Sequence, residues 1–138
     1  MNIVMSEKID IEKLITGFEF PVTSFKLEPT KISTYVRAVG DTSNVYEEND
    51  CVPPMAVAAL AMAAMGKQME LPPGSIHVSQ EFEFADIVKF GEVLTSYATV
   101  KRSVARGKLH MLTVGINVIN QGKNTVVCGE TGFILPHL

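Results

Sequence analysis

Few side chains in this sequence of 138 residues are suited to moving a proton near neutral pH. Histidine suits that task best, because its unperturbed pKa is about 6.5. The chain has three histidines, His77, His110 and His137, which are far apart in the sequence. Neither they nor the two cysteines, Cys51 and Cys128, have the spacing of a metal site. The sequence also lacks a glycine-rich phosphate loop and a nucleophile elbow, so we expect no metal, no cofactor and two free thiols.

Two polar residues fall in a segment that otherwise alternates between apolar and polar side chains. The pattern predicts one strand face formed by Ile76, Val78, Phe82 and Phe84. His77 then lies on the opposite face, where it either enters a ligand cleft or forms a hydrogen bond at a subunit interface. Gln80 breaks the apolar face, and a buried amide needs hydrogen bonds, so it anchors either backbone or a ligand.

The hydrophobic pattern also predicts the helices that surround these residues. The segment Met55 to Met65 is apolar on every side and rich in alanine, which predicts a helix that is almost fully buried. A second helix is predicted after Pro29, with apolar residues on one face and Gly40 at its end. Residues 1–17 are expected to form an N-terminal helical extension, capped by Ser6.

Alternation of period two predicts five strands in an antiparallel sheet. Their expected ranges are 18–27, 75–86, 92–104, 108–120 and 123–135. Pro21 places the first strand at an edge or at a bulge, since proline cannot donate a backbone hydrogen bond. A long antiparallel sheet wrapped around one apolar helix is the α+β hot-dog fold, and we expect a single domain over residues 1–138 with its core in 18–136.

Composition excludes several classes of protein. A formal net charge of −3 argues against a nucleic-acid binder, which usually has a strongly basic face. The N-terminal residues do not resemble a signal peptide, and the longest apolar run, Met55 to Met65, is shorter than the roughly 20 residues that span a bilayer. We therefore expect a cytoplasmic protein with no nucleic-acid or membrane partner.

Four segments in order resemble motifs of the MaoC-like hydratases and dehydratases, especially the N-terminal MaoC dehydratase subgroup. The family patterns are G-D-x-N-P-[ILV]-H, A-P-P-T-F, L-H-G-x-Q and R-P-[IVL]-x-x-G-D-x-L. The matching segments are Gly40-Asp41-Thr42-Ser43-Asn44-Val45-Tyr46, Val52-Pro53-Pro54-Met55-Ala56, Ile76-His77-Val78-Ser79-Gln80 and Asp86-Ile87-Val88-Lys89-Phe90-Gly91-Glu92-Val93-Leu94. The resemblance covers nearly all of residues 18–136.

The resemblance implies that an aspartate and a histidine five residues later add water to an enoyl thioester, or remove it from a 3-hydroxyacyl thioester. Asp41 is present here, but Tyr46 stands in the histidine position. A free tyrosine has a pKa of about 10, so a phenol is a poor base at neutral pH. Tyr46 either donates a hydrogen bond to substrate or merely packs in its loop. Ser43, Asn44 and Gln80 are the further residues expected to contact substrate.

The start of the long helix is altered as well. Free backbone N–H groups at a helix N-terminus suit a thioester oxygen that gains negative charge. Many active hydratases resemble one another in having a glycine where this chain has Pro54, and proline has no N–H. Met55 or Ala56 would then have to supply the donor.

Other charged residues have competing interpretations. Arg37 either pairs with Asp41 or is solvated, and Glu130 is either a thioesterase-like carboxylate or a rim residue. A cluster of four cations at one hairpin tip either meets phosphates of coenzyme A or of a carrier protein, or is simply solvated. The four are Lys101, Arg102, Arg106 and Lys108.

Together these features favour an (R)-specific hydratase- or dehydratase-type subunit that binds acyl-CoA or acyl-carrier thioesters in fatty acid metabolism. We expect a homodimer, or a heterodimer with a related hot-dog subunit that carries the intact aspartate–histidine pair. Two alternatives remain open at this point. The chain is an active hydratase or thioesterase that uses Asp41 with Tyr46 or His77, or it is an acyl-CoA-binding module without turnover.

Overall fold

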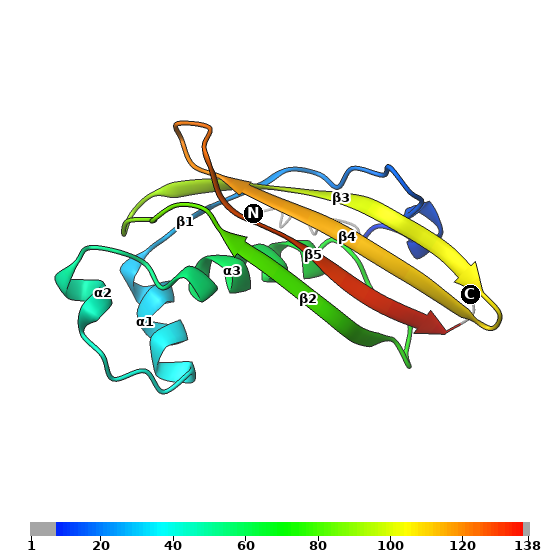
Figure 1. The fold of residues 1–138 in the computed structure, drawn as a ribbon, viewed down its shortest axis with the longest axis horizontal. Coiled ribbons are helices and arrows are strands. Elements are labelled where there is room, and N and C mark those ends of the chain that lie inside the picture. Colours follow the sequence, from blue (N-terminus) through cyan, green and yellow to red (C-terminus); the bar gives the residue numbers. More distant parts are fainter. Residues whose placement is uncertain (1–7, 137–138) are drawn as a thin grey trace, which may run out of the picture.

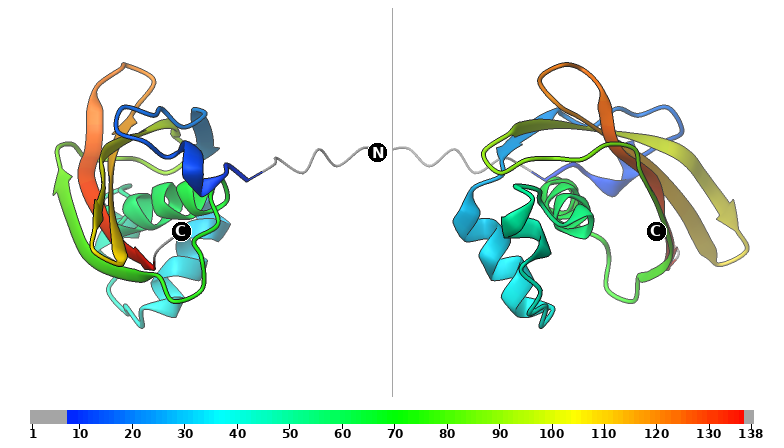
Figure 2. Two further views of the ribbon diagram at one scale, coloured as in Figure 1. Left: turned by 90° about the vertical axis from the view of Figure 1, so that its right-hand side faces the viewer. Right: turned by 60° about the vertical axis from the view of Figure 1, so that its left-hand side comes forward.

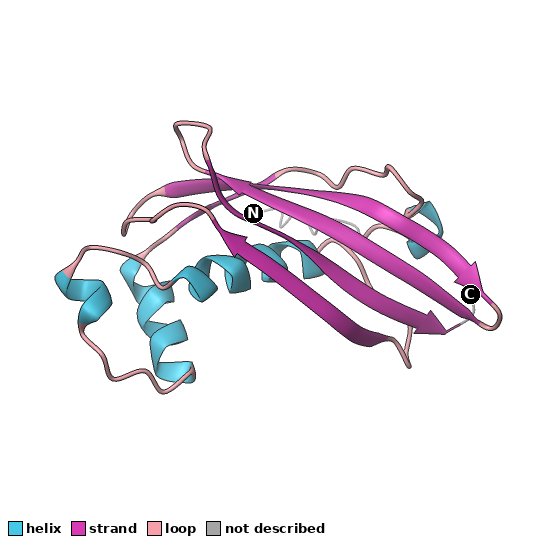
Figure 3. Cartoon of the chain, in the orientation of Figure 1, coloured by secondary structure: helices cyan, strands magenta, loops and turns pink. Residues whose placement is uncertain are grey.

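A computed structural model describes residues 8–136 of the chain. These residues form one 3-10 helix, three α-helices and five strands, which Figure 3 distinguishes by colour. The helices are η1 (Ile11–Lys13), α1 (Pro29–Ala38), α2 (Val45–Glu48) and α3 (Pro54–Gly66). The strands are β1 (Thr23–Lys26), β2 (Ile76–Phe84), β3 (Val93–Arg106), β4 (Leu109–Ile119) and β5 (Thr125–Pro136).

The five strands make one sheet in the order β1-β3-β4-β5-β2, and every pair of neighbours is antiparallel (Figure 1). The sheet curves around α3, while α1 and α2 lie together beyond one end of that helix (Figure 2). This is the arrangement that the sequence predicted, so the α+β hot-dog fold is confirmed. Within residues 8–136, no helix is both long enough and apolar enough to cross a membrane.

The core lies between α3 and the concave face of the sheet. From α3 it takes small residues, Ala56, Val57 and Ala61, each no more than 1% exposed. Alanine lets the strand backbones approach the helix closely, and the larger side chains come from the sheet. Those that are fully buried include Leu94, Val100, Leu112, Val114, Val118, Val126, Val127 and Leu135.

The expectation that the central helix is buried on all sides is wrong for a single chain. Met55 is 46% exposed, and Ala59 and Ala63 are exposed as well. These three residues are spaced four apart, so they form one stripe along α3. The sheet covers only the opposite side of the helix, which leaves this stripe open.

The first strand is shorter than expected. Regular pairing with β3 is confined to Thr23–Lys26, and one isolated bridge joins Glu19 to Thr99. Pro21 lies between these two paired parts, and β1 is at the edge of the sheet, as its proline indicated. The N-terminal extension forms only the 3-10 turn η1, in which the Asp10 side chain accepts a hydrogen bond from the Glu12 N–H; the cap expected at Ser6 lies outside the described residues.

A bulge in β2 overturns the predicted strand face. His77 pairs with Phe133 and Ser79 pairs with Gly132, so Val78 is an extra residue without a partner in β5. One added residue reverses the alternation before it. Ile76 and Val78 are therefore exposed, at 57% and 47%, whereas Phe82 packs against the core.

The two leucines of β4 provide a test of this core. Leu112 is 1% exposed, so Leu112→Ala should lower the free energy of unfolding by about 2–5 kcal/mol. Leu109 is 47% exposed at the start of the same strand, and Leu109→Ala should change it by no more than about 0.5 kcal/mol. Urea unfolding followed by circular dichroism measures both values. Equal losses in the two variants would contradict the placement of the core.

Candidate functional site

Asp41, Ser43 and Tyr46 lie in and just after the loop that joins α1 to α2. Gly40 ends α1 with a positive φ of 71°, a conformation that suits glycine. The Asp41 carboxylate then accepts a hydrogen bond from the Ser43 N–H at 2.8 Å, and the Ser43 hydroxyl accepts one from the Val45 N–H at 3.2 Å. Two short-range turns therefore fix the direction in which the chain enters α2.

These residues line a groove of about 690 Å³, which we call the Asp41 groove. Its size lies in the range of about 300–1,000 Å³ that is usual for small-molecule sites. Ile32, Val36 and Phe90 give it apolar walls, and Arg37 is its one arginine or lysine. The other lining residues are Pro29, Thr30, Ser33, Asp41, Ser43, Tyr46, Glu47 and Asp50.

A second pocket, of about 430 Å³, lies against the start of α3 and is called the helix pocket below. Tyr46 lines both the Asp41 groove and the helix pocket, so the two pockets adjoin at this residue. The remaining lining is mostly apolar. It consists of Cys51, Val52, Pro54, Val57, Phe84, Ala85, Asp86, Ile87, Val88 and Val127.

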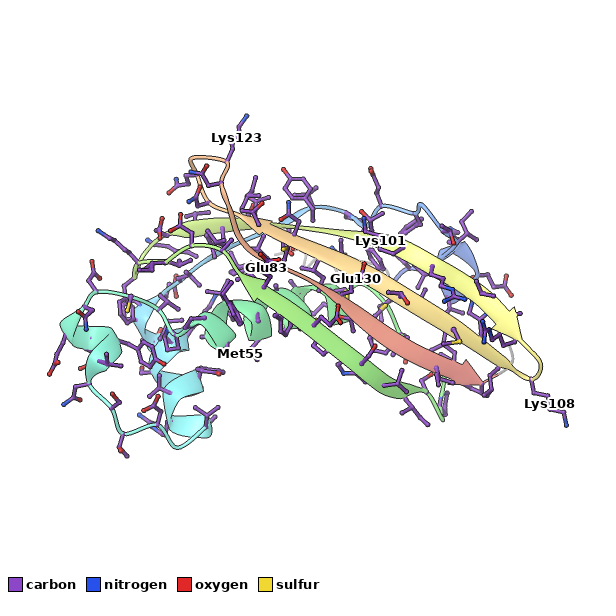
Figure 4. All side chains as sticks on the ribbon, viewed as in Figure 1. Met55, Glu83, Lys101, Lys108, Lys123 and Glu130 are labelled. Carbon is purple, nitrogen blue, oxygen red and sulfur yellow. The ribbon has the colours of Figure 1, made fainter. Side chains whose placement is uncertain are left out.

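The first turn of α3 offers a single backbone donor. Pro53 and Pro54 have no N–H, and the Ala56 N–H donates to the Pro53 carbonyl at 2.9 Å. Of the two donors that the sequence proposed, Ala56 is therefore already occupied, and Met55 is left. Figure 4 shows Met55 at the start of α3.

His77 and Gln80 lie elsewhere in the chain, in a hydrogen-bonded cluster on the concave side of β2. Gln80 Oε1 accepts a hydrogen bond from the buried Thr131 hydroxyl at 2.8 Å and lies 3.1 Å from His77 Nε2. Gln80 Nε2 donates to the Glu130 carbonyl at 3.2 Å. Gln80 thus anchors the backbone of β5, and His77 packs its ring against Phe133 with centroids 5.1 Å apart.

Within one chain, His77 is not brought to Asp41 and Tyr46. The residue of β2 that lines the helix pocket is Phe84, seven residues after His77. At the usual rise per strand residue, the two residues are about 20 Å apart. Asn44 is exposed at the start of α2 and lines neither the Asp41 groove nor the helix pocket. The sequence therefore grouped residues that the fold divides between two places.

The remaining charged candidates also separate. Arg37 is exposed and lines the Asp41 groove. Glu130 and Lys101 line a hollow on the outer face of the sheet, together with Glu81 and Glu83, so Lys101 does not belong to a cluster at the hairpin tip (Figure 4). Lys108 does lie at the tip of the β3–β4 hairpin, at the end of the sheet farthest from α1 and α2.

Sequence reasoning missed several lining residues of the two pockets. Phe84 and Asp86 join the helix pocket, and Phe90 joins the Asp41 groove. Asp86 and Phe90 belong to the loop segment that resembled a family motif, so that loop was the available signal for them. Cys51, which also lines the helix pocket, directly precedes the Val52-Pro53-Pro54 segment.

Residues 8–136 contain no group of three or more histidine, cysteine, aspartate or glutamate side chains placed to hold a metal ion. The two pockets offer a ligand four carboxylates, one guanidinium, a phenol, a thiol and several hydroxyl groups beside their apolar walls. The carboxylates belong to Asp41, Glu47, Asp50 and Asp86.

Solved structures with the same fold include hydratases and dehydratases. The R-hydratase PhaJ1 from Pseudomonas aeruginosa aligns with a TM-score of 0.76 at 20% identity, over 92% of this chain and 85% of that one. A MaoC-like dehydratase from Rhodospirillum rubrum aligns with a TM-score of 0.73 at 16% identity, over 94% and 98%. The HadBC complex of Mycobacterium tuberculosis, a 3R-hydroxyacyl-ACP dehydratase, aligns with a TM-score of 0.68 at 18% identity, over 93% of this chain and 99% of that one.

At these identities the solved structures establish the fold. A search of curated proteins finds no match to the sequence. The family itself is shown by a model of the FAS1-like dehydratase domain region, which matches residues 15–128. The resemblance stated from the sequence is thereby confirmed, and the chain belongs to the family of FAS1-like dehydratase domain regions, with the hot-dog fold of the MaoC-like hydratases.

Proposed function

We propose that this chain is an acyl-thioester-binding subunit of the hydratase/dehydratase class that has little activity alone. Its ligand is an enoyl or 3-hydroxyacyl thioester of coenzyme A or of an acyl carrier. The observation that carries this proposal is the position of Tyr46. It stands between the Asp41 groove and the helix pocket, where the family motif would place a histidine.

The two pockets support binding. Their walls are mainly apolar, which suits an acyl chain or a pantetheine arm, and a few polar groups can fix the orientation of a ligand. The Met55 N–H at the start of α3 can donate to a thioester oxygen, and Pro54 lines the helix pocket beside it. Asp41 lines the adjoining Asp41 groove, which shares Tyr46 with the helix pocket.

The same geometry argues against rapid turnover. A phenol in the position of the histidine is a poor proton carrier, which costs about 100- to 10,000-fold in rate. With Pro53 and Pro54 lacking an N–H and Ala56 bonded to Pro53, the oxyanion site has one donor. Losing a donor costs about another 100- to 1,000-fold. Ligand binding does not depend on either group to this extent, so affinity can persist without catalysis.

An assembly with a second hot-dog subunit completes the proposal. Strand β2 is an edge of the sheet and exposes Ile76, Val78 and Phe84, which are costly to leave in water. HadBC is a complex of two subunits, and a heterodimer of that kind would place this chain beside a catalytic partner. A homodimer through the same edge would cover the exposed side chains of β2 equally well.

Binding is tested by calorimetry with short, medium and long acyl-CoA thioesters. Ala85 is exposed and lines the helix pocket, so the large side chain of Ala85→Trp should fill that pocket. The dissociation constant for acyl-CoA should then rise at least about tenfold. Ala105 is exposed near the far end of β3, and Ala105→Trp is the matched control that should leave affinity unchanged. If no acyl-CoA of any chain length binds, the proposed binding function is refuted, and the chain would be better interpreted as a scaffold for a partner subunit.

Turnover is tested by hydration of crotonyl-CoA. We expect a very low rate for the isolated protein, little gain from Tyr46→His or Pro54→Gly alone, and a larger gain from the two together. The gains should not be additive, because both groups act on one transition state. Asp41→Asn in the double variant should abolish the restored activity. A wild-type protein that is already fast, and is inactivated by Asp41→Asn, would show that it is an enzyme in its own right.

Assembly is tested by light scattering at micromolar concentration. We expect a dimer that Val78→Lys converts to monomer, because a charged side chain on an edge strand opposes pairing. Val22 is 54% exposed near the opposite edge of the sheet, and Val22→Lys should leave the dimer intact. A monomeric wild-type protein would count against association through β2.

A further inference from the structure

Within residues 8–136, strand β1 is paired on one side only, with β3. Leu27, just past the strand, donates its N–H to the Glu92 carbonyl at 2.9 Å, and its carbonyl accepts from the Gly91 N–H at 2.8 Å. Backbone groups alternate in direction along a strand, so those of Ser24 and Lys26 point away from β3. These two residues can therefore donate and accept backbone hydrogen bonds with a further strand.

A groove of about 650 Å³ lies between β1 and the C-terminal half of α3, and we call it the β1 groove. All four residues of β1, Thr23–Lys26, line it. The sheet curves around α3 and stops at β1, so a strand added to β1 would lie along this groove (Figure 2). Much of the lining is apolar and consists of Ile9, Pro21, Phe25, Leu60, Ala63 and Ala64.

Charged side chains stand toward both ends of the β1 groove. Gln68 Nε2 donates to the Pro21 carbonyl at 2.9 Å, which ties the segment after α3 to the entry of β1. Lys67 therefore lies near the start of β1, whereas Lys26 ends that strand and Lys31 follows it in α1. With Glu28 as the one acidic lining residue, the groove has a formal charge of +2, in a chain whose net charge is −3.

This charge selects the kind of strand that can pair there. Lysine on an edge strand opposes indiscriminate pairing, because a partner must cover its charge. Carboxylates placed opposite the lysines supply that compensation, and cross-strand pairs of opposite charge stabilise a sheet. The helix pocket and the Asp41 groove are instead lined by four carboxylates and one guanidinium, so an acidic segment is favoured at the β1 groove and opposed at those pockets.

We propose that the β1 groove binds an extended, acidic segment of another protein, which adds a strand to the free edge of β1. Main-chain hydrogen bonds to Ser24 and Lys26 supply the affinity. Alternate side chains of the bound segment face Phe25, Leu60 and Ala64, and its acidic ends meet the lysines. The inference goes beyond the proposed function, since this groove shares no lining residue with the helix pocket or the Asp41 groove.

A designed peptide tests the binding mode. The probe has nine residues, with valine and threonine alternating in its centre and two glutamates at each end, and fluorescence polarisation follows its binding to the full chain. Two further peptides carry N-methyl groups, one on the valine nitrogens and one on the threonine nitrogens, so each loses the N–H donors of one edge. One of the two should bind at least about tenfold more weakly, and the other should bind like the unmodified peptide.

Amide hydrogen exchange, measured by NMR, locates the bound strand. Saturating peptide should slow exchange at least about tenfold at the Ser24 and Lys26 N–H groups, which face the groove. Thr23 and Phe25 are the internal controls, because their backbone groups face β3 already, and their exchange should change little. Exchange that slows at neither Ser24 nor Lys26 overturns strand addition, even if the peptide binds elsewhere.

Charge reversal tests the role of the lysines. Lys26→Glu combined with Lys67→Glu should weaken peptide binding at least about tenfold at low salt. The matched control combines Lys108→Glu with Lys123→Glu, two lysines at the tips of hairpins that change the net charge equally (Figure 4). The control pair should leave the affinity near that of the wild type. Equal losses in the two pairs would show that net charge alone governs binding, which overturns the site.

Blocking the groove tests its apolar lining. Ala63 is exposed and lines the groove, so Ala63→Trp should abolish peptide binding, while Ala105→Trp on β3 should not. Circular dichroism of each variant confirms that the fold is retained. The proposal is overturned if the unmodified peptide shows no saturable binding at millimolar concentration, or if both methylated peptides bind as well as the unmodified one.

Discussion

The whole architecture depends on covering one apolar helix. Helix α3 has no polar side chain with which to face water, so a sheet must curve around it, and the small residues Ala56 and Ala61 let the strands come close. The helix begins at Pro54, directly after Pro53, and its first turn leaves the Met55 N–H without a partner. The loop after α1 leads into α2, where Tyr46 lines the same pocket as Pro54. The candidate site is therefore positioned by the requirement to bury α3.

Much of this fold could be predicted from the sequence because the pattern and the packing agree. The apolar run Met55 to Met65 became a helix from Pro54 to Gly66, and the four later strands end within two residues of their expected limits. The failures have local causes. Pro21 interrupts the strand predicted over 18–27, and the bulge at Val78 reverses a face that simple alternation had assigned. A bulge places one extra residue in a strand and needs no particular residue type, so the alternation of apolar and polar residues does not predict it.

The candidate site was predictable in part. Asp41 and Tyr46 come from one motif segment and Pro54 from another, and the three residues line two pockets that share Tyr46. Sequence could not show that the Ala56 N–H is bonded to Pro53, because that depends on how the chain turns into the helix. It also could not show that His77 lies at the other end of β2. Two motifs can follow one another in the sequence and still lie far apart in space, because an extended strand of nine residues such as β2 spans a long distance.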